Sequence, residues 1–242
     1  MNAIETQGLT KQYKDVTAVR DLNLTVPAGG LFALLGVNGA GKTTTIKMLS
    51  ALTKPTGGDA FLLGKSVVAE PEAVKQVIAV SPQETAVARK LTVRENLELM
   101  AGIHGTDQAA IREKIGTLAA RFGLDEVLNK AAGKLSGGWQ RRLSIAMALI
   151  LEPKILFLDE PTLGLDVLAR AELWDQIRAL KGEITIILTT HYMEEAEALS
   201  DRIGVMGKGR LLRVGTAAEL KAATGTNTLE EAFIALAKEG VQ

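Results

Sequence analysis

Hydrophobic positions along the first part and the last part of the chain form short, dense runs. Four such runs, at positions 31–35, 77–80, 155–158 and 184–188, are separated by longer stretches in which apolar residues recur with helical spacing. An alternation of this kind is typical of buried parallel strands joined by crossover helices. We therefore predict an α/β fold built on a mainly parallel sheet.

The middle of the chain has a different pattern. Between positions 92 and 128 the apolar residues keep helical spacing, as at Val93, Leu97 and Met100, and no strand-like run interrupts them. This segment is predicted to be a helical insertion between two portions of one sheet-based core.

The last part of the chain predicts a hairpin followed by two helices. The segments 202–206 and 210–214 flank the turn sequence GKG at 207–209, a pattern typical of paired antiparallel strands. Thr216 is then a suitable N-terminal cap for one helix, and Thr228 for a second that contains LEEAFIALAKEG.

Composition and charge exclude several classes of function. The 242 residues include 28 Lys and Arg against 28 Asp and Glu, so the net charge gives no general attraction for nucleic acid. The absence of cysteine excludes disulfides, thiolate metal sites and thiol nucleophiles. The longest apolar run, 145–151, is far shorter than the ~20 residues of a spanning helix, and the start of the chain does not resemble a signal peptide. We expect a cytosolic chain that does not cross a membrane by itself.

A glycine-rich segment predicts a phosphate-binding loop. GVNGAGKT follows the apolar run at 31–35 and precedes a helical stretch, which is the context that the G-x-x-x-x-G-K-[ST] motif requires. Glycines let backbone N–H groups surround phosphate oxygens, and a helix N-terminus favours negative charge. The alternative is a glycine-rich turn with a solvated lysine. The predicted phosphate-binding residues are Gly36, Val37, Asn38, Gly39, Ala40, Gly41, Lys42, Thr43 and Thr44.

Two carboxylates and a histidine follow other predicted strands. Asp159 and Glu160 come directly after the run at 155–158, and we assign Asp159, with the Thr43 hydroxyl, to Mg²⁺. Glu160 should point elsewhere, which suits a base that polarises the attacking water, although a simple strand-ending charge is the alternative. His191 follows the run that starts at 184 and is predicted to contact the γ-phosphate rather than to serve only in packing. His104 lies between glycines in a predicted surface turn and receives no role.

Four motifs together resemble the ATP-binding cassette family of transporter ATPases. They are GVNGAGKTT, LSGGWQRR from position 135, ILFLDEPTLGLD and TTHYMEEAE, in that order and spacing. The resemblance covers nearly the whole chain and implies a P-loop NTPase core with an antiparallel β subdomain and a helical insertion. One departure is Trp139, which stands where the family commonly has glutamine.

The resemblance also implies roles for further residues. Tyr13 would stack on adenine, although an amphipathic surface aromatic is the alternative, and Gln83 would contact Mg²⁺ or water and relay the nucleotide state. Signature residues of one subunit would bind the γ-phosphate held by another, so two copies, or this chain and a paralogue, would pair head to tail around two ATP molecules. The residues implied at that interface are Ser136, Gly137, Gly138 and Asp166, of which Ser136 and Gly138 bind nucleotide.

By the same resemblance the chain is a single cassette domain over 1–242. Its nucleotide-binding core would comprise 1–83 and 153–215, its helical subdomain with the signature would comprise 84–152, and its C-terminal helices would comprise 216–242.

The function implied by the resemblance is ATP hydrolysis that powers transport. The membrane permease would be a separate chain, and the cassette would lie on the cytoplasmic face of the cell membrane. The stretches YMEEAEALSDRIGVMGKGRLLRVGT, LTVRENLELMAGIHG and TLEEAFIALAKEG most resemble the drug and multidrug exporter branch, and are also close to sodium and polysaccharide exporters. The alternative is a soluble ATPase of the same family without a transport partner, such as the iron–sulfur assembly type. A non-catalytic regulator is disfavoured because Glu160 and His191 are both present.

Overall fold

A six-stranded sheet forms the centre of the protein in the computed structural model, which describes residues 1–103 and 108–239. The strand order is β11-β10-β4-β9-β8-β7, and neighbouring strands are parallel except for β11, which is antiparallel to β10. The strands are β4 Leu31–Leu35, β7 Ile78–Ser81, β8 Ile155–Asp159, β9 Thr185–Thr190, β10 Arg202–Gly207 and β11 Arg210–Gly215. The predicted parallel strands and the predicted hairpin are confirmed, with ends shifted by one or two positions.

The strands are apolar on both sides because each side of the sheet packs on a separate core. In β4, for example, Leu31, Ala33 and Leu35 belong to one hydrophobic cluster, whereas Phe32 and Leu34 belong to the other. The second cluster includes buried residues of α1 (Lys42–Leu49). The first includes buried residues of five helices later in the chain, α5 (Gly137–Leu149), α6 (Val167–Arg178), α7 (Met193–Leu199), α8 (Ala217–Thr224) and α9 (Leu229–Glu239). The helix that follows the phosphate loop therefore lies on the opposite face of the sheet from α5.

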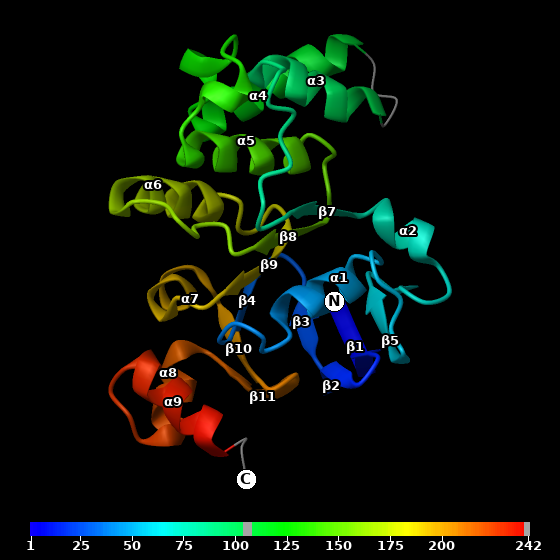
Figure 1. The fold of residues 1–242 in the computed structure, drawn as a ribbon, viewed down its shortest axis with the longest axis vertical. Helices are drawn as coiled ribbons and strands as arrows, with labels where there is room; N and C mark the ends of the chain where they lie inside the picture. Colours follow the sequence, from blue (N-terminus) through cyan, green and yellow to red (C-terminus); the bar gives the residue numbers. More distant parts are fainter. Residues whose placement is uncertain (104–107, 240–242) are drawn as a thin grey trace.

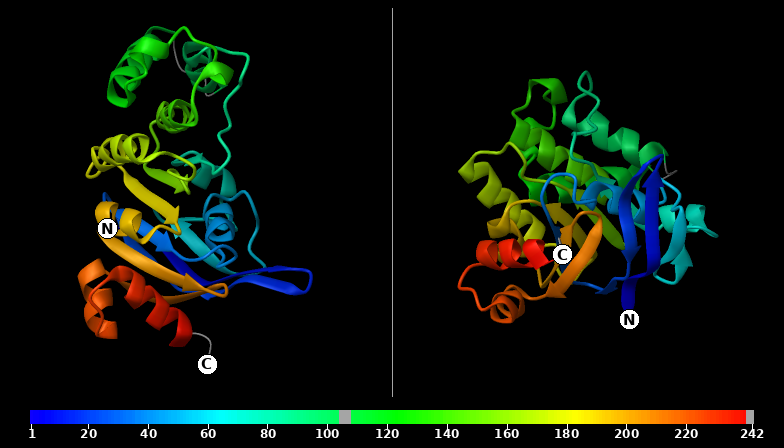
Figure 2. Two further views of the ribbon diagram at one scale, coloured as in Figure 1. Left: turned by 60° about the vertical axis from the view of Figure 1, so that its left-hand side comes forward. Right: turned by 60° about the horizontal axis from the view of Figure 1, so that its bottom comes forward.

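An antiparallel sheet packs against the second cluster together with α1 (Figure 1). Its order is β2-β1-β5-β6, with β3 also paired to β1. The hairpin of β1 and β2 projects from the body of the molecule (Figure 2). The strands are β1 Asn2–Tyr13, β2 Val16–Leu22, β3 Thr25–Pro27, β5 Gly57–Leu62 and β6 Lys65–Ser66.

Among the described residues between β7 and β8, the regular elements are all helical, as the periodicity predicts. The short helix α2 (Pro71–Lys75) precedes β7. The segment between β7 and β8 forms the upper part of the molecule in Figure 1. Its elements are α3 Val93–Ile103, α4 Gln108–Phe122, the 3₁₀ turns Asp125–Val127 and Ala132–Lys134, and α5 Gly137–Leu149. The surface turn predicted at His104 lies outside the described residues.

The remaining helices cover the first cluster. They are α6 Val167–Arg178, α7 Met193–Leu199, α8 Ala217–Thr224 and α9 Leu229–Glu239. Thr216 caps α8 in a reciprocal arrangement with Glu219, and the Thr228 hydroxyl accepts from the Glu231 N–H at 3.2 Å, so both predicted caps are confirmed. Within 1–103 and 108–239, none of the helices is both long enough and apolar enough to span a bilayer.

Candidate active site

Three strand ends meet at the phosphate loop. The register pairs Leu35 of β4 with Thr190 of β9, and Thr189 with Asp159 of β8. Because parallel strands share one carboxyl edge, Gly36, Glu160 and His191 all follow strands at this edge. The topology thus brings the phosphate loop together with two strand ends that lie more than one hundred positions later in the sequence.

Glycine is required at particular positions of the loop. Gly39 has a φ of 82° and Gly41 a φ of 103°, which are left-handed values that L side chains rarely adopt. A Cβ added to Gly41 would lie 2.5 Å from the Ala18 carbonyl oxygen. One added to Gly36 would lie 2.8 Å from the Met206 carbonyl oxygen. The loop therefore fits against its neighbours only with glycine, as a close backbone cradle for phosphate demands.

Lys42 is buried and directed into the loop. Its side chain is 5% exposed, its Nζ donates to the Gly36 carbonyl at 2.6 Å, and it forms an ion pair with Glu160 Oε1 at 3.1 Å. The alternative of a solvated lysine in a glycine-rich turn is therefore wrong. A buried ammonium inside the loop, whose one anionic partner among the described residues is Glu160, is placed to bind anionic phosphate oxygens.

Asp159 accepts two hydroxyl hydrogen bonds. Thr43 Oγ1 lies 3.2 Å from Asp159 Oδ1, and Thr189 Oγ1 donates to the same oxygen at 2.5 Å. Carboxylate and hydroxyl oxygens are the hard ligands that Mg²⁺ prefers. The pair formed by Thr43 and Asp159 therefore fits the predicted metal.

Glu160 contacts different partners from its neighbour, as predicted, but both carboxylates lie against the phosphate loop. Its Oε2 lies 2.5 Å from His191 Nδ1, while Oε1 faces Lys42. Its φ of 51° departs from strand geometry, and its backbone N–H donates to Thr189 Oγ1 at 3.1 Å. This unusual backbone turns the carboxylate into the site. Glu160 is therefore more than a solvated charge at a strand end.

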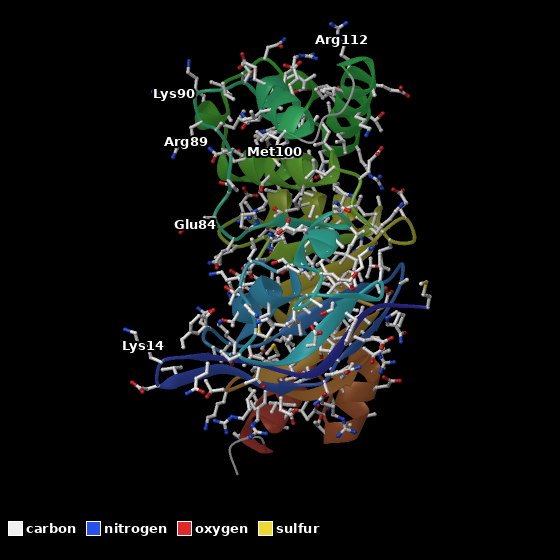
Figure 3. All side chains as sticks on the ribbon, turned by 90° about the vertical axis from the view of Figure 1, so that its right-hand side faces the viewer. Lys14, Glu84, Arg89, Lys90, Met100 and Arg112 are labelled. Carbon is white, nitrogen blue, oxygen red and sulfur yellow. The ribbon has the colours of Figure 1, made fainter. Side chains whose placement is uncertain are left out.

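An open cleft of about 590 Å³ lies over the loop. Its lining includes residues 38–44, Glu160 and Gln83, so three predicted groups are brought together there. Tyr13 is outside this lining, although residues 16–18 of the same hairpin belong to it. Tyr13 is 44% exposed, with Lys11 Nζ 5.0 Å from its ring centroid. It lies next to the hairpin tip that Lys14 marks in Figure 3.

The signature turn lies away from the cleft of its own chain. Ser136 is the N-cap of α5, and Ser136 and Gly137 are exposed. The Trp139 ring packs against the first cluster, 5.0 Å from the Arg142 guanidinium carbon, which leaves the turn before it uncovered. Asp166 caps α6 by accepting from the Ala169 N–H at 2.9 Å. The signature residues and Asp166 are thus not united with the phosphate loop within one chain.

Three residues at or near the site have no assignment from the sequence. Thr189 donates to Asp159, and buried Glu195 accepts from Thr162. Buried Arg141 donates to the backbone carbonyls of Pro82 and Gln83. The burial of Arg141 and Glu195 could have been predicted from the sequence, because each is spaced to lie on the same helix face as its apolar neighbours. A charged residue at such a position is buried only with polar partners.

The comparisons with known proteins now decide the family. The model of the family described as ABC transporter matches residues 19–163. The chain belongs to the ABC transporter family. Among ABC relatives, the daunorubicin/doxorubicin resistance ATP-binding protein DrrA of Streptomyces peucetius is 45% identical, over 94% of this chain and 69% of that protein. A doxorubicin resistance ATP-binding protein of Mycobacterium tuberculosis is 40% identical, over 94% of this chain and 70% of that protein.

Solved ABC structures agree with the fold. A structure described as the ATP-binding subunit of an ABC transporter has a TM-score of 0.86 at 30% identity and covers 97% of this chain and 99% of its own. The cbiO1 protein of Clostridium perfringens, described as part of the transporter complex cbiONQ, has a TM-score of 0.84 at 27% identity, with 91% of each chain covered. The fold is that of a P-loop NTPase, and the chain is an ATP-hydrolysing subunit of an ABC transporter. The soluble alternative is not supported.

Proposed function

We propose that this chain powers export through a separate membrane permease, from the cytoplasmic face of the cell membrane. The ATP-binding relatives named for daunorubicin and doxorubicin resistance support the exporter role. The cbiO1 neighbour, described as part of the ABC transporter complex cbiONQ, supports a permease on other polypeptides. Changes at the nucleotide would reach that permease through the helical part of the chain.

Glu160 is proposed as the base that polarises the attacking water. The observation that carries this role is its position between Lys42 Nζ at 3.1 Å and His191 Nδ1 at 2.5 Å. When ATP phosphates occupy the cleft, they offer Lys42 stronger anionic partners than one carboxylate. Glu160 is then released to accept a proton from water, while His191 contacts the γ-phosphate. Because ATP draws Lys42 and His191 away from Glu160, Glu160 acts as a base mainly when ATP is bound.

Thr43, Asp159 and Gln83 are the residues proposed to hold Mg²⁺. When bound, the ion would neutralise charge that develops on the β- and γ-phosphates. Thr189 supports this assignment, because its hydroxyl fixes one oxygen of Asp159.

A head-to-tail pair of cassettes is proposed to complete the site. Ser136, Gly137 and Gly138 of one subunit would contribute N–H groups and a helix N-terminus to the γ-phosphate held by another. Exposure of this turn on its own subunit, and its position on a helix across the sheet from α1, support that arrangement. Asp166 would lie at the same interface.

The remaining assignments follow the same cassette plan. Tyr13 is proposed to stack on adenine, which its half-exposed ring permits. We also propose a nucleotide-binding core of 1–83 and 153–215, a helical subdomain of 84–152 and C-terminal helices of 216–242.

Two measurements test the function. Phosphate release should be at least about 100-fold slower in Glu160→Gln than in wild type, because the base is lost, while Glu194→Gln on the exposed side of α7 keeps wild-type turnover. Capture of the tagged chain from detergent-solubilised cells should recover a polytopic membrane protein. Near-normal turnover of Glu160→Gln contradicts the catalytic assignment, and recovery of soluble partners alone contradicts the transport role.

A further inference from the structure

Arg141 is a buried cation in the helix that begins at the signature turn. Its side chain is 5% exposed, and it lies one helical turn after Gly137 on the same side of α5 as the buried residues Ser144, Ile145 and Ala148. A guanidinium at such a position is tolerated only with strong hydrogen-bond partners.

Those partners are two consecutive backbone carbonyls. Arg141 Nη1 donates to the Pro82 carbonyl at 2.6 Å, and Nη2 donates to the Gln83 carbonyl at 2.5 Å. The planar guanidinium reaches both oxygens with two different nitrogens, a geometry that a lysine ammonium cannot reproduce. The peptide that carries Gln83 is therefore attached to α5.

Arg141 lies where three loops meet. A hollow of about 340 Å³ beside it is lined by the Gln83 segment, by Gly137 of the signature turn and by residues 163–165 before Asp166. Burial lowers the pKa of Arg141, and the negative charges of Asp159 and Glu195 oppose that shift. The residue stays protonated, because arginine remains charged throughout the physiological range.

Among the residues that line the cleft over the phosphate loop, Gln83 alone lies on the segment that leads to the helical part. That segment runs from β7 to α3, and Glu84, Arg89 and Lys90 project from it in Figure 3. α5 is already joined to the end of β7, because the buried hydroxyls of Ser81 and Ser144 lie 3.0 Å apart. The two hydrogen bonds of Arg141 extend this attachment to the Gln83 peptide, and breaking them would leave a buried cation without those partners.

We propose that Arg141 is a positioning residue that makes Gln83 and the signature turn of the same subunit move as one unit. When Gln83 responds to nucleotide, the backbone at Pro82 and Gln83 carries Arg141 and therefore the start of α5. The signature turn thereby reaches the position that a partner nucleotide requires. This inference rests on the proposed function, in which Gln83 senses the bound nucleotide.

Arg142 provides a matched control. It is the next residue of the same helix and has the same chemistry, but its guanidinium contacts Glu172 of α6 and the Trp139 ring. Replacement of either arginine by lysine keeps the charge. A difference between the effects of Arg141→Lys and Arg142→Lys is therefore due to loss of the two carbonyl contacts of Arg141.

The absence of native cysteine makes a distance measurement direct. Spin labels on Lys47→Cys in α1 and Glu98→Cys in α3, both exposed, report the helical part relative to the core. In the Glu160→Gln background we expect the label distance to differ between MgADP and MgATP. Arg141→Lys should lose most of that shift and broaden the distribution, whereas Arg142→Lys should retain it. The proposal is overturned if the label distance shifts equally in Arg141→Lys and in the Glu160→Gln chain with Arg141 intact. It is also overturned if the distance in that Glu160→Gln chain is the same in MgADP and MgATP.

Kinetics supply a second readout that loss of stability alone would not produce. With Glu160 intact, Arg141→Lys should lower kcat about tenfold or more through misplacement of the signature, while the KM for ATP changes by less than about threefold. Arg141→Met tests whether a side chain that fills the space of Arg141 without its hydrogen bonds is enough to keep kcat. It should behave like the lysine variant. Wild-type kcat in the folded lysine variant contradicts the proposal.

A Gln83→Ala variant separates this inference from the proposed function. Loss of the label shift in Gln83→Ala but not in Arg141→Lys makes the Arg141 proposal alone wrong. Retention of the shift in both variants contradicts the sensing role of Gln83 as well. Absence of ATP hydrolysis by the wild-type chain and its permease contradicts the proposed function itself.

Discussion

Replacing Glu195 with alanine should destabilise the protein through the segment that links Glu160 to Asp166. Glu195 is fully buried on α7, and its Oε1 accepts from Thr162 Oγ1 at 2.7 Å and from Trp174 Nε1 at 3.1 Å. Thr162 lies two positions after Glu160, so this carboxyl supports the backbone that carries the proposed base.

The structure sets the magnitude. Alanine would leave the Thr162 hydroxyl buried without an acceptor, at a cost of about 1–3 kcal/mol, and the Trp174 N–H adds a smaller cost because it is only partly buried. We expect a loss of about 2–4 kcal/mol in the free energy of unfolding, or roughly 5–15 °C in Tm for a chain of this size. Glu195→Gln keeps an acceptor for both donors and should lose less than about 1 kcal/mol.

Stability should also depend on pH through this group. Burial raises the pKa of Glu195 above its ordinary value of 4.5, and the charge of Glu160 adds to the shift, against hydrogen bonds from Thr190, Thr162 and Trp174. The folded chain then binds more protons than the unfolded chain at pH values above 4.5. Its free energy of unfolding therefore falls as pH rises through that window. Glu195→Gln lacks this titrating group, so its free energy of unfolding should increase relative to that of wild type as pH rises.

Urea denaturation at several pH values, with Glu194→Ala as the exposed control, measures these effects. The control should change the free energy of unfolding by no more than about 0.5 kcal/mol. A Glu195→Ala variant as stable as the control would refute the reasoning from buried donors. A difference between wild type and Glu195→Gln that is constant from pH 5 to 8 would refute the raised pKa.

Three further variants test the nucleotide site. Lys42→Ala should lower kcat by at least about 100-fold in a phosphate-release assay, and near-normal turnover would refute the loop assignment. Tyr13→Ala should weaken ATP binding by about 1 kcal/mol or more in calorimetry while Tyr13→Phe retains it, and unchanged affinity would place adenine elsewhere. Gly41→Ala puts a Cβ 2.5 Å from the Ala18 carbonyl oxygen and should abolish ATP binding, unlike Gly116→Ala, whose Cβ meets nothing within 4 Å.

Local patterns were sufficient to predict most elements of the main sheet. The strand at β4 and the phosphate loop carry their signal within about twenty positions, and the same holds for the hairpin of β10 and β11. In that hairpin Lys208 and Gly209 both have positive φ, which is the geometry that a two-residue turn between twisted strands requires. The antiparallel sheet followed only from the family resemblance, because the bulges that interrupt the pairing of β1 break its alternation.

The contacts of the site were less predictable, because they depend on the register between distant strands. Asp159 and His191 could be placed at strand ends from their positions alone. The ion pair of Glu160 with Lys42 could not, because it follows from a positive φ at Glu160 that no local pattern indicates. The partners of Arg141 could not be predicted either, because they are backbone carbonyls, which every residue has.

The mass of the Glu160→Gln variant in MgATP is the most direct test of an ATP site shared by two chains. Slow hydrolysis should trap two chains around two nucleotides, so sedimentation should give about twice 25.7 kDa in MgATP and a single chain in MgADP. Adding Ser136→Arg at the exposed signature turn should restore the single-chain mass without weakening binding to the phosphate loop. A Glu160→Gln chain that binds MgATP and remains at 25.7 kDa would show that ATP does not pair two chains.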